Sequence, residues 1–363
     1  MKDTDVFAER RGAVSSQLSE RKLDALLIGF GPNLRYLTGF TGSNGMLLIT
    51  PRDATFWTDP RYAIQAGEQV SCRTRVAKGH LLRQVIGTVA KRSLRRLGFE
   101  KARTTFDQYE TLRNALPIKA SLHPVSGWIE KMRMVKSSAE IAAIRDAVTL
   151  NSKAFEQAVR RARAGMREID LAAELEFRMR RLGAEKPAFE TIVASGKRSA
   201  KPHAEPSEAP LRPKELVVVD MGAQRSGYAS DMTRMLHVGE AAPKTRRLHR
   251  AVLEAQLAAL DAVRAGVTAE TVDRAARSVL RGFGLDRAFT HSTGHGLGLE
   301  IHEPPRLGKK DKTVLEAGMA ITVEPGVYLE GFGGIRIEDT VVVTERGCEI
   351  LTPTSKELRL IEA

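Results

Sequence analysis

Apolar residues recur at helical spacing in several stretches of this chain. The clearest pattern predicts a long amphipathic helix whose apolar face consists of Ile141, Ile144, Val148, Phe155 and Val159. Ser137 and Glu140 have the spacing of a capping box, so we expect this helix to begin there and to end at Gly165. Similar spacing predicts an early helix through Val14 and Leu18 and further helices over residues 81–97, 169–182, 245–264 and 268–282.

Short apolar runs bounded by turn residues predict β-strands between these helices. They lie at residues 23–28, 45–50, 55–58, 216–221, 235–238, 320–323 and 335–343. We interpret residues 1–130 as a smaller α/β domain. A connector follows at about residues 128–136. Residues 131–363 mix helices and strands without a strict βαβ order, so we expect an α+β fold there.

Composition and charge narrow the class of protein. The chain has 363 residues, enough for two cores, and a formal net charge of +13. Such a charge is compatible with nucleic-acid binding, but the basic residues are scattered in short runs such as Arg160-Arg161, which favours a solvated basic surface and no nucleic-acid partner. In the first domain, Asp59 and Arg61 lie in the run WTDPRY, where a structural salt bridge is the simplest interpretation.

Cysteine usage and hydropathy indicate the compartment. The two cysteines, Cys72 and Cys348, are far apart and form no CxxC motif, which is typical of a reducing environment. The N-terminal run MKDTDVFAERR has no apolar segment of a signal peptide, and no apolar run is long enough to span a bilayer. We therefore expect a cytoplasmic protein without membrane contact.

Two aspartates lie on the two adjacent strands of one predicted hairpin. Asp220 follows the apolar run LVVV, and Asp231 comes eleven positions later in SDMTR. A turn near Ser226-Gly227 would place both on adjacent strands. A buried strand that delivers a carboxylate is costly unless the charge is paired or bound to a metal. Two separately paired aspartates remain an equally good explanation at this point.

Further carboxylates occur at strand ends nearer the C-terminus. Glu324 follows the run ITV and precedes Pro-Gly, and Glu338 lies in IRIEDT. In a strand, alternation puts Arg336 and Glu338 on one face and the two isoleucines on the other. A single carboxylate of this kind is usually structural. Four in one domain, all on strands or at strand ends, favour a shared site.

His295 is flanked by glycines in the run HSTGHGLGLEIHEPP. Its spacing of four from His291 would suit a zinc pair on a helix, but Gly294, Gly296 and Gly298 argue against a helix there. The same glycines match a dinucleotide loop poorly, because no strand–helix context surrounds them. Beside four placed carboxylates, a histidine ligand is the better hypothesis.

At these residues the chain resembles the pita-bread metallopeptidases, in particular their Xaa-Pro branch of aminopeptidase P and prolidase. The catalytic motifs that carry the resemblance are VVVDMGA, YASDMTR, HSTGHGLGLEIHEPP, VEPGVY and GIRIED. The run NLRYLTGFTGSNGMLLI with WTDPRY resembles that branch's creatinase-type N-terminal domain, and RMVKSSAEI resembles its link. The resemblance implies a pita-bread catalytic domain preceded by a creatinase-type domain.

The resemblance also implies a two-metal site. All five ligand positions of the family are occupied, by Asp220, Asp231, His295, Glu324 and Glu338. By this likeness Asp231 and Glu338 bridge two divalent ions, and the hydroxide between the ions attacks the carbonyl before proline. An oxygen-rich ligand set suits manganese first, with cobalt or zinc as alternatives.

Other residues match the family's substrate-side positions. They are His203, His291 and His302, which the resemblance assigns to substrate positioning and oxyanion stabilisation, and Arg336, which would orient Glu338 or reach the substrate. Glu324 has a second expected role as acceptor of the water's proton. The remaining histidines at 80, 123, 237 and 249 match no motif.

The leading hypothesis is therefore a metal-dependent peptidase whose substrate has proline in its second position. The motifs do not separate prolidase, which cleaves dipeptides, from aminopeptidase P, which accepts longer peptides. The alternatives are a non-catalytic pita-bread protein that binds nucleic acid or histones, and a related hydrolase of a non-peptide amide. A homodimer is a further expectation from the family.

Overall fold

A computed structural model describes residues 5–363 and divides the chain into two compact units, one ending at Arg133 and one beginning at Met134. The start of the run MKDTDVFAERR, on which the absence of a signal peptide was predicted, lies outside the described residues. No helix among residues 5–363 is long and apolar enough to cross a membrane.

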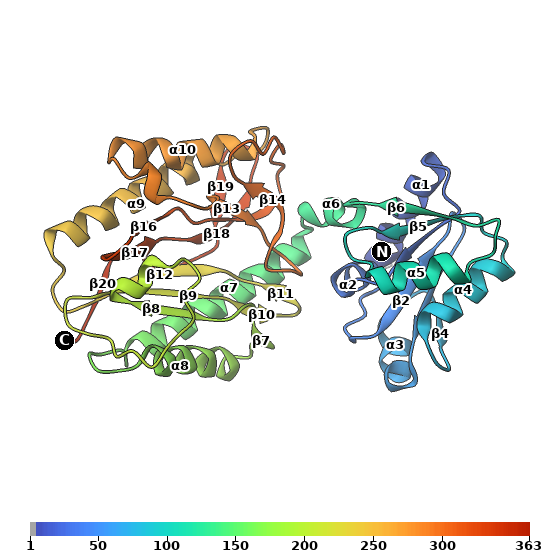
Figure 1. The fold of residues 1–363 in the computed structure, drawn as a ribbon, viewed down its shortest axis with the longest axis horizontal. Helices are drawn as coiled ribbons and strands as arrows, with labels where there is room; N and C mark the ends of the chain where they lie inside the picture. The colour runs from blue at the N-terminus through green and yellow to red at the C-terminus, as the bar shows by residue number, and fades with distance from the viewer. Residues whose placement is uncertain (1–4) are drawn as a thin grey trace. The chain divides into compact units, whose positions relative to one another are not determined.

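The N-terminal unit contains one six-stranded mixed sheet in the order β4-β3-β2-β1-β5-β6 (Figure 1). Its elements are α1 (Val6–Glu20), β1 (Ala25–Ile28), α2 (Gly31–Thr38), β2 (Gly45–Ile49), β3 (Ala54–Thr58), η1 (Pro60–Tyr62), α3 (Ala63–Gln69), β4 (Arg73–Val76), α4 (Leu81–Lys91), β5 (Arg96–Glu100), α5 (Phe106–Ala115) and β6 (Ser121–Val125), followed by α6 (Trp128–Met134). All four residues of β1 are buried, as expected for a strand covered on both faces. Helix α4 packs on one face through Val85 and Val89. The prediction of an α/β N-terminal domain is confirmed.

One sequence prediction about this part was wrong. The helix predicted over residues 81–97 ends at Lys91, because Ser93 has φ 54° and turns the chain into β5, which takes up Leu97. The apolar spacing continued across that turn by coincidence. The connector expected at 128–136 contains the boundary between the two units, and most of it forms α6. Asp59 and Arg61 form the predicted ion pair, with 2.8 Å between Nη2 and Oδ2.

The second unit consists of helices on two sides of several short sheets. Its elements are α7 (Ser138–Val159), α8 (Glu168–Arg181), β7 (Lys186–Pro187), β8 (Ile192–Ser195), η2 (Gly196–Ala200), β9 (Leu216–Met221), β10 (Ala223–Arg225), β11 (Tyr228–Ala229), β12 (Met232–Val238), α9 (Pro243–Ala262), α10 (Ala269–Gly282), η3 (Asp286–Ala288), β13 (Gly294–Gly296), β14 (Glu303–Leu307), β15 (Ala320–Val323), β16 (Gly326–Leu329), β17 (Gly333–Arg336), β18 (Asp339–Val343), β19 (Cys348–Ile350) and β20 (Arg359–Ile361).

This unit has two main hydrophobic cores with strands between the helical layers (Figure 1). One core joins α7 and α8 to the sheet β20-β12-β9-β8, and the other joins α9 and α10 to strands of the sheet β14-β13-β15-β18-β19. Helices and strands are mixed without βαβ repetition, so the α+β prediction is confirmed. The strands that carry the candidate ligand residues lie between the two layers and are held from both sides.

Local signals placed two of these elements correctly. Ser137 caps α7 and Glu140 completes the predicted capping box. The predicted hairpin is formed by β10 and β11, and Ser226 and Gly227 at its turn have φ of 50° and 77°. The predicted end of α7 at Gly165 was wrong. The helix ends at Val159, and Gly165 serves a later turn with φ 82°.

The predicted strand over residues 335–343 is two strands. β17 pairs with β16, whereas β18 pairs with β15, so the chain changes sheets at Ile337 and Glu338. The two isoleucines nevertheless point inward as predicted, because Ile335 and Ile337 are buried in the α9–α10 core. The strand predicted at 235–238 begins earlier, at Met232. Glu338 therefore lies where two sheets meet.

Candidate metal centre

Five chemically competent side chains come together from five segments of the second unit. Asp220 lies in β9, and Asp231 directly precedes β12, which pairs with β9 in a register that places Thr233 opposite Asp220. Glu324 directly follows β15, Glu338 lies between β17 and β18, and His295 is the central residue of β13. Each carboxylate occupies a strand or a strand end, as the sequence pattern predicts.

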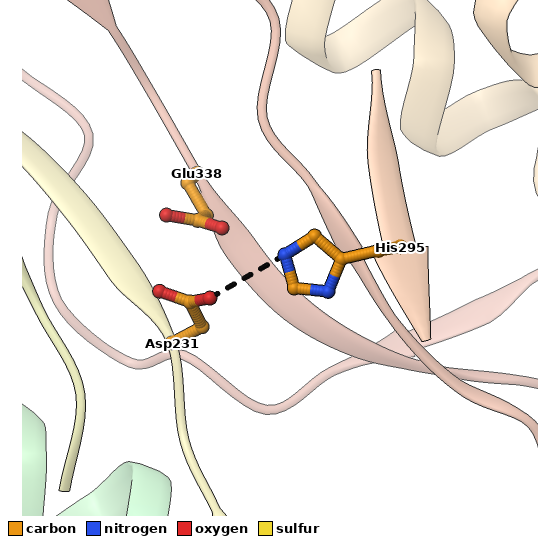
Figure 2. Close-up of side chains that lie close together, drawn as sticks. All are labelled: Asp231, His295 and Glu338. Atoms are coloured by element: carbon orange, nitrogen blue, oxygen red, sulfur yellow. Dashed lines mark ion pairs between the residues drawn. The ribbon is translucent and has the colours of Figure 1, made fainter. Parts of the chain in front are cut away.

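The closest group is formed by Asp231, His295 and Glu338. Each offers one ligand atom, and these atoms lie within 4.8 Å of one another. His295 Nε2 is 3.6 Å from Asp231 Oδ2 and 3.3 Å from Glu324 Oε1. Figure 2 shows the imidazole pointing at the two carboxylates from the opposite side. The arrangement suits a cation held between nitrogen and oxygen ligands.

Glycines beside His295 allow the strands to approach closely. A Cβ at Gly294 would lie 2.0 Å from the carbonyl oxygen of Thr322, and one at Gly296 would lie 2.3 Å from that of Pro304. Such contacts exclude any larger residue without backbone movement. The segment is a strand, so the rejection of a helical histidine pair at 291 and 295 is confirmed.

The tautomer of His295 is set by its backbone. Nδ1 donates a hydrogen bond of 3.0 Å to the carbonyl oxygen of Gly296. Burial lowers the pKa of His295 below its usual value, so the ring is neutral near pH 7. Nε2 then carries a free lone pair that faces the carboxylates, which is the state a metal-ligating histidine needs.

The carboxylates repel one another in a buried place. Burial, reinforced by neighbouring carboxylates, raises the pKa of Asp231 and of Glu338 well above their usual values. Burial also raises the pKa of Glu324 to about 7. Four carboxylates face one guanidinium, Arg336, which leaves a net charge of −3 at full ionisation. A divalent cation would relieve this repulsion.

An unpaired oxygen atom points to the same conclusion. Asp220 Oδ2 accepts a hydrogen bond of 2.6 Å from Arg336 Nη2, but Asp220 Oδ1 is buried without a partner. Buried carboxylate oxygens without donors are rare in native proteins. The donor set therefore fits divalent metal ions.

A hydrogen-bonded chain leads from Asp220 to His291. Arg336 Nη1 donates to the Tyr328 hydroxyl at 2.6 Å, and that hydroxyl lies 2.9 Å from His291 Nε2. Burial raises the pKa of Tyr328 to about 12 and lowers that of His291 to about 4, so both are neutral near pH 7. Both ring nitrogens of His291 contact protein groups, since Nδ1 lies 2.8 Å from the carbonyl oxygen of Ser292.

Thr233 and Arg234, which follow Asp231 in the chain, support the segments that carry the candidate ligand residues. Thr233 Oγ1 donates to Glu338 Oε2 at 2.7 Å and accepts from Arg336 Nε at 3.0 Å. Arg234 uses every N–H of its guanidinium; its acceptors are the carbonyl oxygens of Thr233, Glu338, Thr354 and Ser355 and the carboxylate of Asp339. The 2.6 Å bond to the Glu338 carbonyl oxygen fixes the backbone of that carboxylate.

These supporting residues were not identified from the sequence. Tyr328 lies within the quoted motif VEPGVY, and Thr233 lies within YASDMTR, so their motifs were seen but their roles were not. A signal for Thr233 existed, because strand alternation puts it on the same face as Asp231. No local pattern indicates that Tyr328 reaches Arg336.

The four carboxylates, His295, His291 and Arg336 line a cavity of about 1270 Å³. His203 and His302, from the sequence prediction, also line it, and both are exposed. The ring centroids of His302 and His295 are 4.4 Å apart. The loop that carries His203 is tied to the site by Arg336, whose Nη1 donates to the Pro202 carbonyl oxygen at 3.3 Å. None of the other four histidines lines this cavity among the described residues.

Two protein-family models match this chain. The model of Metallopeptidase family M24 matches residues 142–345, and that of the Creatinase/Prolidase N-terminal domain matches residues 10–135. The chain belongs to metallopeptidase family M24. The predicted pita-bread catalytic domain after a creatinase-type N-terminal domain is thereby confirmed.

Relatives of this M24 metallopeptidase match over nearly their whole length. An Xaa-Pro dipeptidase of Pyrococcus horikoshii is 37% identical, covering 98% of this chain and 99% of its own. A solved Xaa-Pro dipeptidase from Bacillus anthracis has a TM-score of 0.95 at 39% identity and covers 98% and 100%. The crystal structure of an X-Pro aminopeptidase from Thermotoga maritima has a TM-score of 0.88 at 38% identity and covers 94% and 99%.

Proposed function

We propose that this M24 metallopeptidase hydrolyses the bond before proline in Xaa-Pro dipeptides or at peptide N-termini. The observation that carries the proposal is the buried group of four carboxylates and one neutral histidine on the wall of a large cavity. The similarity to Xaa-Pro dipeptidases and to an X-Pro aminopeptidase supports the choice of substrate. A non-catalytic role would leave this charge repulsion without a purpose.

Two divalent ions would be held by Asp220, Asp231, His295, Glu324 and Glu338, and manganese is the metal we propose first. When bound, such ions supply a water of lowered pKa and polarise the scissile carbonyl. Asp231 and Glu338 are the proposed bridging ligands. Their raised pKa values describe the metal-free protein, in which each carboxylate retains a proton to higher pH.

The chain's own residues would then manage protons and orientation. Glu324 lies within 3.3 Å of His295 at the centre of the group and is the proposed acceptor of the water's proton. His302 and His203 are exposed on the cavity wall and can donate hydrogen bonds to the substrate. Arg336 orients Asp220 directly and Glu338 through Thr233. His291 is proposed to act on the substrate through its place on the wall, with its orientation set by Tyr328.

The test measures cleavage by metal-depleted protein with and without added Mn(II) or Co(II). The substrates are Gly-Pro, Ala-Pro and Arg-Pro-Pro. Metal-dependent release of proline from the dipeptides supports the proposal, and cleavage of Arg-Pro-Pro in addition selects an aminopeptidase. Absence of metal-dependent cleavage of all three would refute it. A homodimer in the cytoplasm completes the proposal, and sedimentation of the purified protein tests the oligomeric state.

A further inference from the structure

A second cavity of about 930 Å³ adjoins the active-site cavity. One wall is the segment 286–292, which includes η3, and the other is the turn of residues 306–313; we call this cavity the basic recess. Five residues line both cavities: His291, Ser292, Arg306, Asp311 and Thr313. A peptide bound at the candidate metal centre would therefore reach the recess without crossing open surface.

The recess is positively charged. Six cationic side chains line it against the two carboxylates of Asp286 and Asp311. Arg277 pairs with Asp273, and Lys312 pairs with Glu270. Arg287, Lys309 and Lys310 make no ion pair or side-chain hydrogen bond with any described residue. These three cations are free to bind a carboxylate from outside the protein.

The walls are fixed before any ligand binds. The Asp311 carbonyl oxygen accepts from the amide of Glu270, and the Thr313 carbonyl oxygen accepts from that of Ala269, each at 2.9 Å, so the turn is tied to the start of α10. Arg277, on the same helix, donates to the carbonyl oxygens of Phe289 and His291 on the facing wall. A preformed site loses less entropy on binding than a flexible one.

Charge determines which end of a peptide the recess accepts. A free N-terminal ammonium would be repelled by it, whereas the carboxyl side of a peptide would be attracted. The α8 side of the active-site cavity has the opposite charge, because Glu176, Glu190 and Glu205 line it. Figure 1 shows α8 and α10 on opposite sides of this unit. The charges thus favour one direction for a bound chain, with its C-terminal part toward α10.

We propose that the basic recess binds the residues that follow proline, and that the preferred substrates are peptides longer than two residues with Asp or Glu directly after the proline. This rests on the proposed peptidase function and makes it more specific. Lys309 and Lys310 at the tip of the turn, with Arg287 opposite, would contact the acidic side chain. The recess would then act on substrate choice without taking part in bond cleavage.

The test compares Ala-Pro-Glu-amide with Ala-Pro-Gln-amide, which differ only in the charge of one side chain. We expect kcat/KM to be about fivefold higher for the Glu peptide at low ionic strength, chiefly through KM, and the preference to fade with added salt. The double variant Lys309→Glu/Lys310→Glu should reverse the preference while its kcat for Ala-Pro stays unchanged.

The matched control is Lys153→Glu/Arg160→Glu, which alters the net charge equally at two exposed cations in and just after α7 that line neither cavity. It should keep the wild-type preference. Equal rates for the Glu and Gln peptides in the wild type, or equal effects of the two double variants, would overturn the inference. So would cleavage of Ala-Pro with neither longer peptide cleaved. Failure on Ala-Pro as well would overturn the proposed function itself.

Discussion

A buried carboxylate of the N-terminal unit and the carboxylates of the candidate metal centre in the second unit have opposite surroundings. Glu100, in the N-terminal unit, is 8% exposed and accepts hydrogen bonds from the amides of Gly29 and Phe30 and from the side chain of Asn33, at 2.7–3.0 Å. Burial raises its pKa, while these three donors act in the other direction. Its negative charge is already solvated by the protein.

The carboxylates of the candidate metal centre lack such solvation. Glu338 receives one side-chain hydrogen bond from Thr233, Glu324 receives one from Thr322, and Asp220 has an oxygen atom without a partner. For Glu338, neighbouring carboxylates raise the pKa beyond the effect of burial. Burial alone thus does not distinguish a structural acid from a metal ligand; the number of donors around it does.

The largest effect should come from Glu338→Gln. This change keeps the shape but removes one negative ligand, so we expect at least about a 100-fold loss of kcat, because even residues that only support metal ligands cost 10–100-fold. Metal content after dialysis should fall in parallel, while circular dichroism stays unchanged. Retained activity at full metal content would contradict the proposed bridging role.

Glu100→Ala should lower stability and leave metal binding unchanged. Its removal leaves the amides of Gly29 and Phe30 without their acceptor, so we expect a loss of about 1–3 kcal/mol in the free energy of unfolding of the N-terminal unit. Urea unfolding measures this loss. At a temperature where the variant is folded, its metal content should equal that of the wild type; a metal-deficient variant would show that the contrast between the units is wrong.

A smaller and more specific effect is expected from Thr233→Val. It removes the hydroxyl that joins Glu338 to Arg336, so metal affinity measured by calorimetry should fall about 10-fold. Thr38→Val is the matched control, since the buried Thr38 hydroxyl bonds only the backbone of Leu34 and Phe40. Both variants should lose about 1 kcal/mol of stability. Equal metal affinity in the two would refute the role of Thr233.

The smallest effect concerns pH. Burial raises the pKa of Glu324 from 4.5 to about 7, and a carboxyl with a raised folded-state pKa contributes stability that is lost as pH increases through that value. The melting temperature of metal-free protein should therefore fall by a few degrees between pH 5 and pH 8. Added Mn(II) should remove the fall, and Glu324→Gln should reduce it, because Asp231 and Glu338 also have raised pKa values. A flat profile for the wild type would contradict the charge repulsion.

Local sequence signals predicted the parts of the site that depend on one strand at a time. The runs before Asp220 and Glu324, the glycines around His295 and the hairpin at Ser226-Gly227 each specify backbone through short-range sterics. The predictions that failed also rested on local signals. Apolar spacing continued past the true end of α4 at Lys91, and uninterrupted strand formers hid the change of sheet at Glu338.

By itself the sequence predicted which residues would form the candidate metal centre and which strands would deliver them. Only the tertiary structure decided how those residues are supported: Tyr328 joins Arg336 to His291, and Arg234 holds the Glu338 backbone across 104 positions of sequence. The basic recess likewise forms only when α10 brings two separate segments together. Strand and turn formation depend on neighbours in the chain, whereas hydrogen bonds between distant side chains depend on how the packed layers align.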